Sequence, residues 1–281
     1  MSASRWLSPQ SPFAIRSYRF QWSADLMTSW AFEMETVILG WYIMVTTQSV
    51  MLVTLFGSLQ FLGTLVAPLF GVAGDAIGHR RVMILMRAAY ALLAAVLAML
   101  VPADLLTPAL VLAVAGLAGM IRPSDMSVRA VLIGESVPDD RLMSAISLSR
   151  ITTDSARIGG ALAGAGIVAI QGMAAAYLIV VLLYVLGIGL TFGVRVSPAS
   201  DRGQSGAAPS VLRGLWQAAQ AVWQAPPQLA AMLLAFLVNL TAYPFPLGLL
   251  PYIARDVYGT TQAGLGYLVA AVAGGGIAAS L

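Results

Sequence analysis

The chain has 281 residues, of which 59% are hydrophobic and only 10% are charged, and its formal net charge is +3. This composition, with a mean hydropathy of +0.85, cannot give a water-soluble globule a polar surface, so it predicts a protein embedded in a lipid bilayer. The chain has no cysteine and one histidine, which excludes disulfides and clustered thiolate or histidine metal sites. Since all 15 basic residues are arginine, the catalytic lysine and the P-loop of an ATP-driven pump are absent, and we expect no cofactor and no nucleic-acid partner.

The first 21 residues form an N-terminal segment. They contain three arginines and two prolines, with neither the apolar core nor the small-residue cleavage site of a signal peptide. We therefore interpret residues 1–21 as a cytoplasmic segment ahead of the first membrane helix.

Eight apolar runs follow this segment, each close to the 20 or so residues that a membrane-spanning helix needs. They cover residues 22–47, 50–72, 82–101, 108–133, 142–170, 173–194, 228–250 and 261–281. The first six predict a helical bundle over residues 22–194, and the last two predict the start of a second bundle over residues 228–281. The expected fold class is an all-α membrane protein.

The arginines outside these runs are distributed unevenly between the two sides of the membrane. Those on the side of the N-terminus are Arg5, Arg16, Arg19, Arg80, Arg81, Arg141, Arg195, Arg202 and Arg213. The opposite loops hold only Arg255. Because cytoplasmic loops are enriched in arginine, this asymmetry predicts a multi-pass protein of a cell membrane, such as a bacterial inner membrane, with a cytoplasmic N-terminus.

The stretch between the second and third runs, GVAGDAIGHRR over residues 71–81, predicts a short polar cytoplasmic hairpin. Gly71 and Gly78 allow a sharp turn or a close approach of the backbone. The fixed charges at the bilayer edge are Asp75, Arg80 and Arg81.

This loop resembles the G-x-x-x-D-R-x-G-R-R signature of the major facilitator superfamily of secondary transporters. Gly71, Asp75, Gly78 and Arg80 match the signature, whereas Ala76 replaces its usual arginine and His79 another basic residue. The resemblance implies two six-helix halves that rock about a central cavity, with Asp75 as a latch at the cytoplasmic helix ends.

Residues 195–227 interrupt the apolar runs. They begin with small and polar residues and continue as an amphipathic stretch that contains Trp216 and Trp223, so we expect a flexible cytoplasmic linker whose second part lies on the membrane surface. The resemblance places such a linker between the two halves of the carrier.

Three further stretches resemble one branch of the superfamily, the branch that includes the enterobactin exporter and macrolide efflux proteins. They are METVILGWYIM, IRPSDMSVRAVLIGESVPDDRLMSAISL and LLAFLVNLTAYPFPLGLLPYIARDVYG, in the first, fourth and seventh runs. This resemblance implies export of an amphipathic small molecule, a drug or a siderophore-like compound.

Nine charged residues of the first, fourth and fifth runs are candidates for function, because a charge near the bilayer centre costs about 2.5 to 3.5 kcal/mol and usually faces a cavity or a partner. They are Asp25, Glu33 and Glu35 in the first run, Arg122, Asp125 and Arg129 in the fourth, and Arg150, Asp154 and Arg157 in the fifth. In the fourth and fifth runs the spacings of three and four place each set on one helix face. Two readings follow: ion pairs that lock the fourth helix to the fifth, or charges that line a substrate cavity.

Glu33 and Glu35 point about 200° apart on a helix, so they cannot both face a cavity squarely. At least one of them should pair with an arginine. We favour Glu33 as the carboxylate that couples transport to protons, with a fixed ion pair as the alternative.

The fifth run also contains SARIGGALAGAG, in which Gly159, Gly160 and Gly164 form a stripe of small residues. Such a stripe lets two helices pack backbone to backbone. It also loosely resembles the antiporter motif of exporters, with which it shares the helix and part of the glycine spacing.

These observations favour a secondary transporter, driven by protons, over an enzyme, because no catalytic motif is present. The alternative is a membrane protein of the same fold that does not transport. Since the second half offers only two runs, we expect that the missing helices, or a second chain, are needed for a full carrier.

Overall fold

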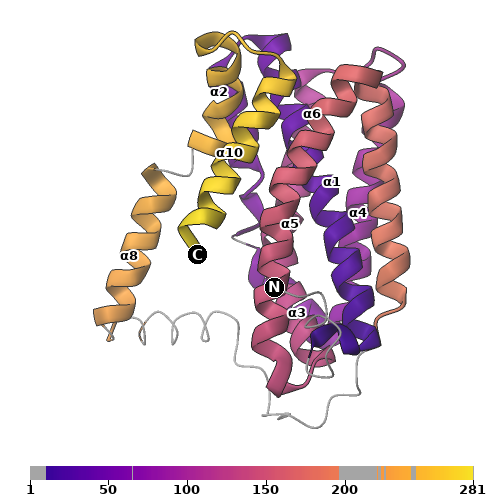
Figure 1. The fold of residues 1–281 in the computed structure, drawn as a ribbon, viewed down its shortest axis with the longest axis vertical. Helices are drawn as coiled ribbons and strands as arrows, with labels where there is room; N and C mark the ends of the chain where they lie inside the picture. Colours follow the sequence, from indigo (N-terminus) through magenta and orange to yellow (C-terminus); the bar gives the residue numbers. More distant parts are fainter. Residues whose placement is uncertain are drawn as a thin grey trace.

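The computed structural model describes residues 11–64, 66–195, 220, 223–224, 226–241 and 245–280. Within these residues the protein is built from helices, most of them aligned with the long axis of the molecule (Figure 1). The predicted all-α class is confirmed. Residues 1–10 and most of the 195–227 linker lie outside the described residues, although Trp223 is described and is exposed. The predicted bound of the N-terminal segment at residue 21 is wrong, because the first helix already begins at Arg16.

The first half of the chain forms the main bundle. Its helices are α1 (Arg16–Thr47), α2 (Val50–Leu59), η3 (Leu62–Thr64), α3 (Ala67–Ile77), α4 (His79–Leu100), α5 (Pro108–Ser136) and α6 (Asp139–Phe192). In the described part of the chain, α4, α5 and α6 are each long and apolar enough to cross a membrane, and the bent pair Val50–Thr64 and Leu69–Ile77 adds a fourth candidate. Their outward side chains include many exposed leucines, valines and methionines, as lipid contact requires.

Helix α6 runs for 54 residues, about 80 Å at the usual rise, which is far longer than a bilayer is thick. It is broken at Gly172, whose φ of 84° lies in the region that favours glycine. The break falls where the sequence predicts the boundary between the runs 142–170 and 173–194, so α6 provides two antiparallel segments rather than one span.

The predicted polar hairpin over residues 71–81 is wrong in extent. Residues 71–77 continue α3, and the chain turns at a single residue, Gly78, with φ 92° and ψ 132°. Helix α4 then begins at His79. A helix ends where the backbone leaves helical φ/ψ values, and in this stretch the only residue with a positive φ is Gly78. The polar side chains before Gly78 are therefore compatible with the helix.

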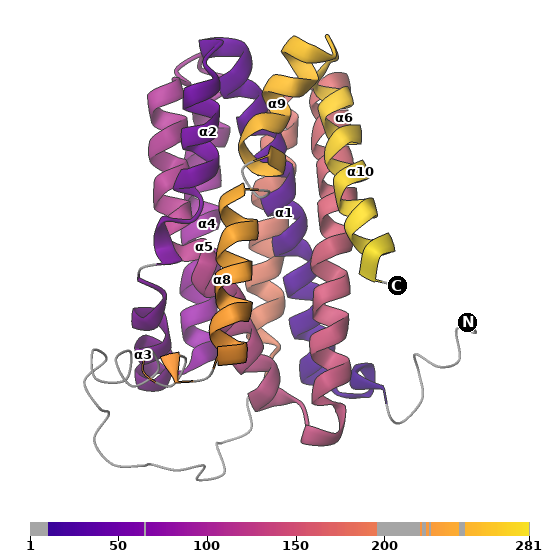
Figure 2. The ribbon, with the colours of Figure 1, turned by 90° about the vertical axis from the view of Figure 1, so that its left-hand side faces the viewer.

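The second half supplies α8 (Pro226–Thr241), η4 (Phe245–Leu249), α9 (Leu250–Tyr252), η5 (Ile253–Val257) and α10 (Gln262–Ser280). The predicted runs 228–250 and 261–281 correspond to these elements. Helix α10 packs on α6, and α9 packs on α1 and α2, whereas α8 stands apart from the bundle (Figures 1 and 2).

Helix α1 lies at the centre of the bundle and contacts α2, α5, α6, α9 and α10. The glycine stripe of α6 explains its closest contact. A Cβ at Gly164 would lie 2.9 Å from the Cα of Met34, and one at Gly160 would lie 2.9 Å from the Cβ of Glu33. Only glycine lets the two backbones approach this closely, so the stripe is a packing surface for α1.

One end of the bundle gathers the N-terminal end of α1, the α3–α4 turn and the C-terminal end of α6. The Ser17 hydroxyl donates to the carbonyl of Arg195 over 2.9 Å, and the Arg80 guanidinium donates to the carbonyls of Thr191 and Phe192. These segments therefore lie together at one end of the bundle, as the arginine distribution predicts for segments of one membrane side.

Candidate functional site

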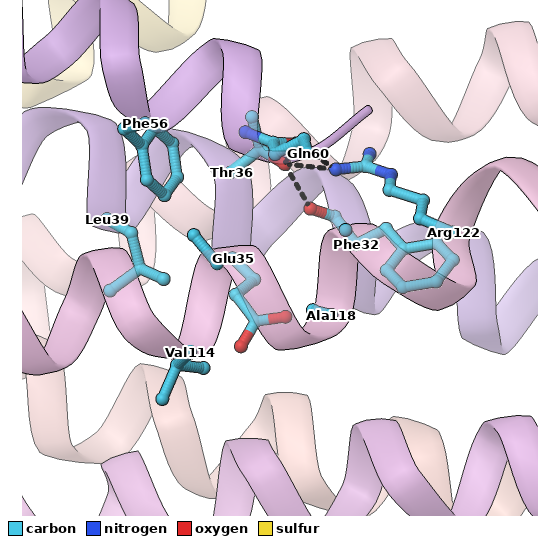
Figure 3. Close-up of a pocket in the computed structure, with 11 residues that line it drawn as sticks. Phe32, Glu35, Thr36, Leu39, Phe56, Gln60, Val114, Ala118 and Arg122 are labelled. Carbon is cyan, nitrogen blue, oxygen red and sulfur yellow. Dashed lines mark hydrogen bonds between the residues drawn. The ribbon is translucent and has the colours of Figure 1, made fainter. Parts of the chain in front are cut away.

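A small pocket with a volume of about 30 Å³ opens between α1, α2 and α5 (Figure 3). Its apolar lining residues are Phe32, Leu39, Phe56, Val114, Ala115 and Ala118. Its polar lining residues are Glu35, Thr36, Gln60 and Arg122. The pocket thus combines hydrophobic walls with one acid, one base, one hydroxyl and one amide.

Arg122 is held from several sides. Its Nη1 donates to the Thr36 hydroxyl over 3.2 Å and to the Gln60 side-chain oxygen. Its Nη2 lies 3.9 Å from the Glu33 carboxylate, and its guanidinium lies 4.8 Å from the centre of the Phe32 ring. The Arg122 guanidinium, the positive charge of the pocket, is therefore already paired with side chains of the protein itself.

Glu33 lies between two arginines on different helices. Besides Arg122 of α5, its carboxylate is 3.7 Å from Nε of Arg157 in α6, and Arg157 is also 3.5 Å from the Asp154 carboxylate. The charged stripes of the predicted fourth and fifth helices therefore meet through α1, and the expected direct ion pairs between those two helices are not seen among the described residues.

Glu35 differs from Glu33, although the two carboxylates lie on the same helix. It lines the pocket, and its Oε2 accepts a hydrogen bond from the Tyr184 hydroxyl over 3.0 Å. Within the described part of the chain, no arginine lies within ion-pair distance of Glu35. In the structure Glu33 is thus the carboxylate paired with arginines and Glu35 the one that lines the pocket, while the coupling role of Glu33 stays a prediction.

A second charged cluster is buried nearer the α3–α4 end of the bundle. The Arg87 guanidinium of α4 is hydrogen-bonded to Asp25 of α1, and Arg129 of α5 lies 3.5 Å from Asp25 and 2.7 Å from Asp125. Two acids and two arginines balance in charge, so this quartet acts as a structural tie among three helices. Asp25, Asp125 and Arg129 were candidates for transport, but they do not line the pocket.

The sequence analysis missed Arg87 as a member of this quartet. Its side chain is only 1% exposed, and it also donates to the Thr191 hydroxyl and to the Gly187 carbonyl of α6. The sequence did contain an indication of this role, because an arginine in the middle of the apolar run 82–101 is costly unless it pairs with an acid or another polar group.

The remaining candidates lie away from the pocket. Arg150 is exposed, and it joins no ion pair among the residues that the structure describes, so the predicted Arg150–Asp154 pair is absent there. The Asp75 side chain is 81% exposed and lies 3.9 Å from the His79 ring, while Arg81 is exposed. His79 also contacts the Glu135 carboxylate of α5 over 2.7 Å, so it ties the α3–α4 turn to the end of α5.

Among the described residues no group of acids and histidines could hold a metal ion.

A comparison with protein families finds that the model described as transmembrane secretion effector, a division of the major facilitator superfamily, matches residues 7–281. A search of curated proteins finds no match.

Proposed function

This chain belongs to the transmembrane secretion effector family of the major facilitator superfamily, a family of membrane transporters, and from this premise we propose that it exports an amphipathic small molecule in exchange for protons. The pocket between α1, α2 and α5 is the substrate site, and Glu35 is the carboxylate that takes up and releases the proton. No enzymatic step is part of this function.

The observation that carries the proposal is the position of Glu35. It lines the pocket, and within the described residues it has a tyrosine but no arginine as a partner. Ionisable groups in the membrane are costly, and those that face a cavity usually serve a substrate or proton pathway. A carboxylate without a fixed positive partner can bind either a proton or a ligand, which is what exchange requires.

The packing of the second half supports alternating access. Leu250 and Ala254 are buried against Val37 of α1 at the end of the bundle opposite the α3–α4 turn. Helix α8, in contrast, stands apart from the bundle (Figure 1). Contacts of this kind between the two halves are the ones that a rocking cycle would form and break.

The experiment is an exchange assay in inverted membrane vesicles. Vesicles with the full chain are energised to an acidic interior, and proton release is followed by a pH-sensitive dye after addition of ethidium, rhodamine 6G or a comparable amphipathic compound. We expect compound-dependent proton release from the wild type and none from Glu35→Gln. Glu33→Gln is the matched neighbour on the same helix; exchange that survives in Glu35→Gln but not in Glu33→Gln would assign coupling to Glu33.

The second candidate function is a non-transporting protein of the same fold. It is favoured by Ala76 and His79 in the loop motif and by the exposure of Asp75, whose contact with the His79 ring is 3.9 Å long. If Asp75 is nevertheless a latch, Asp75→Asn lowers exchange while the amount of protein in the membrane stays near normal. If Asp75→Asn lowers exchange and the amount of protein equally, the role of Asp75 is structural. If the wild type shows no exchange at all, the non-transporting function is favoured.

A further inference from the structure

We propose that the pocket selects organic cations that also carry a hydrogen-bond acceptor, with the cationic group bound by Glu35 and the acceptor bound by the side-chain amide of Gln60. This inference rests on the proposed transport function, because it names the substrate class of the same pocket.

The charge of the pocket favours a cation. Glu35 and Arg122 line the pocket, and Arg122 is linked through Glu33 to Arg157 and Asp154 outside the lining, so the connected network holds three carboxylates and two guanidiniums. Both guanidiniums are paired with Glu33, and Arg122 also covers the Phe32 ring. The charge left over is the Glu35 carboxylate, so an ammonium group fits the site and an anionic ligand, such as a siderophore-like acid, does not.

Gln60 supplies the second contact. Its side-chain oxygen accepts from Arg122 and lies 3.4 Å from the Thr36 hydroxyl, as the dashed lines in Figure 3 show. Because a guanidinium can only donate, this bond fixes the orientation of the amide and leaves its Nε2 as the free donor. Gln60 is 6% exposed, and its Nε2 has no hydrogen-bond partner among the described residues.

A buried N–H without a partner is unfavourable, and the groups that remain so in a folded protein need an explanation. Here Gln60 lines the pocket, so an acceptor atom of a bound ligand would satisfy it. A carbonyl or ether oxygen is such an acceptor and, unlike a hydroxyl group, brings no donor of its own to a site already crowded with donors.

The local fold places Gln60 at the pocket. It follows the last residue of α2, where the helix ends before η3, and a Cβ at Gly119 of α5 would lie 2.8 Å from its Cα. Gly119 therefore lets the interrupted end of α2 press against α5. Interrupted membrane helices of this kind commonly form transporter binding sites, because their ends present polar groups to a ligand.

The test is equilibrium dialysis of three matched probes against the purified full chain in lipid nanodiscs. The probes are 4-(dimethylamino)butyrophenone with both groups, N,N-dimethyl-4-phenylbutylamine without the carbonyl, and butyrophenone without the amine. We expect the first probe to bind the wild type about threefold to tenfold more tightly than the second, the contribution of one hydrogen bond. Butyrophenone should bind most weakly.

Three variants assign these preferences to residues. Glu35→Gln should weaken both amines about tenfold or more, because it removes a charged partner. Gln60→Leu should abolish the advantage of the carbonyl, so that the first and second probes bind with equal affinity. Should Gln60→Leu fail to fold, Gln60→Glu keeps the acceptor for Arg122 while it removes the N–H donor, and it must also lose the advantage.

Gln262→Leu is the matched control, since Gln262 is likewise buried with an unpaired Nε2 but lies outside the pocket. It should bind all three probes as the wild type does. The inference is overturned if no probe binds at millimolar concentration, if butyrophenone matches the amines, or if the carbonyl advantage survives in both Gln60 variants. If the probes do not bind but other compounds still drive proton release that depends on Glu35, the transport function is supported and this substrate class is wrong. If the probes bind as expected but no protons are released, the substrate class is supported and the transport function is wrong.

Discussion

The Arg255 guanidinium of η5 donates a hydrogen bond through Nη1 to the main-chain carbonyl of Met44, near the C-terminal end of α1, over 3.1 Å. Met44 lies 211 residues away in the chain, so this contact joins the second half of the protein to the central helix. Carbonyls in the last turn of a helix carry a partial negative charge, which favours a nearby arginine. The contact therefore stabilises the closed end of the bundle.

The first prediction is that Arg255→Ala opens this end. We expect a cysteine at Val37, which is buried against Leu250 and Ala254, to react with a small maleimide about tenfold faster in the Arg255→Ala background, as the loss of a hydrogen bond to a charged group allows. The chain has no native cysteine to interfere. A cysteine at Ala94, in the main core, is the control, and an unchanged rate at position 37 would show that Arg255 does not hold the end closed.

The second prediction concerns the packing of α6 on α1. Gly164→Ala should lower the free energy of unfolding by about 1 to 3 kcal/mol, because its Cβ would lie 2.9 Å from the Cα of Met34 and the backbones must separate. Gly166→Ala, two residues further along α6, is the matched control, since a Cβ there has no atom within 4 Å. Thermal unfolding in detergent measures both, and equal midpoints would contradict the packing interpretation.

The third prediction concerns the buried quartet. Arg87→Ala leaves Asp25 buried with one fewer positive partner, so we expect a loss of about 3 to 5 kcal/mol in the free energy of unfolding. The double variant Asp25→Ala, Arg87→Ala should lose less than the sum of the two single changes, because no unpaired charge from this pair remains. Arg81→Ala, on the exposed surface, should be neutral. Additive losses would mean that the two side chains do not interact.

The helices could be predicted from the sequence because lipid imposes a simple requirement, about 20 apolar residues between polar breaks. The glycine stripe was also readable, since only close helix packing needs small residues at that spacing. The end of α3 was missed for a physical reason. The glycines and charges of residues 71–81 suggested a loop, whereas helix geometry is lost only at Gly78.

The partners of the charges could not be read from the sequence. Spacing tells which residues share a face of one helix, but Asp25 and Arg87 are 62 residues apart and Glu33 and Arg157 lie on different helices. Whether Glu33 or Glu35 meets the arginines depends on how α5 and α6 pack around α1. That packing depends on the whole bundle and leaves no local pattern.

The fourth prediction is the orientation in the membrane. The α3–α4 turn should be cytoplasmic, so a single cysteine at Ala76, which is exposed, should resist an impermeant maleimide added to intact cells. A cysteine at Thr260, near the opposite end of the bundle, should react. Permeabilised cells are the control, in which position 76 must also react, and labelling of position 76 from outside would reverse the topology.

The last prediction concerns the hydroxyl that holds Glu35 in place. Tyr184 is fully buried, its ring packs against Phe32 and Tyr90, and its hydroxyl donates to the Glu35 carboxylate over 3.0 Å. Tyr184→Phe keeps the ring and removes only the hydroxyl, so the aromatic packing should survive while the carboxylate loses the contact that orients it toward the pocket. We expect Tyr184→Phe to weaken the binding of 4-(dimethylamino)butyrophenone about threefold to tenfold and to slow proton exchange. Tyr177→Phe is the matched control, because Tyr177 lies on the same helix, is fully buried, and its hydroxyl has no hydrogen-bond partner among the described residues. Tyr177→Phe should bind the probe as the wild type does; if both variants lose binding equally, the effect comes from the core and not from the hydroxyl on Glu35.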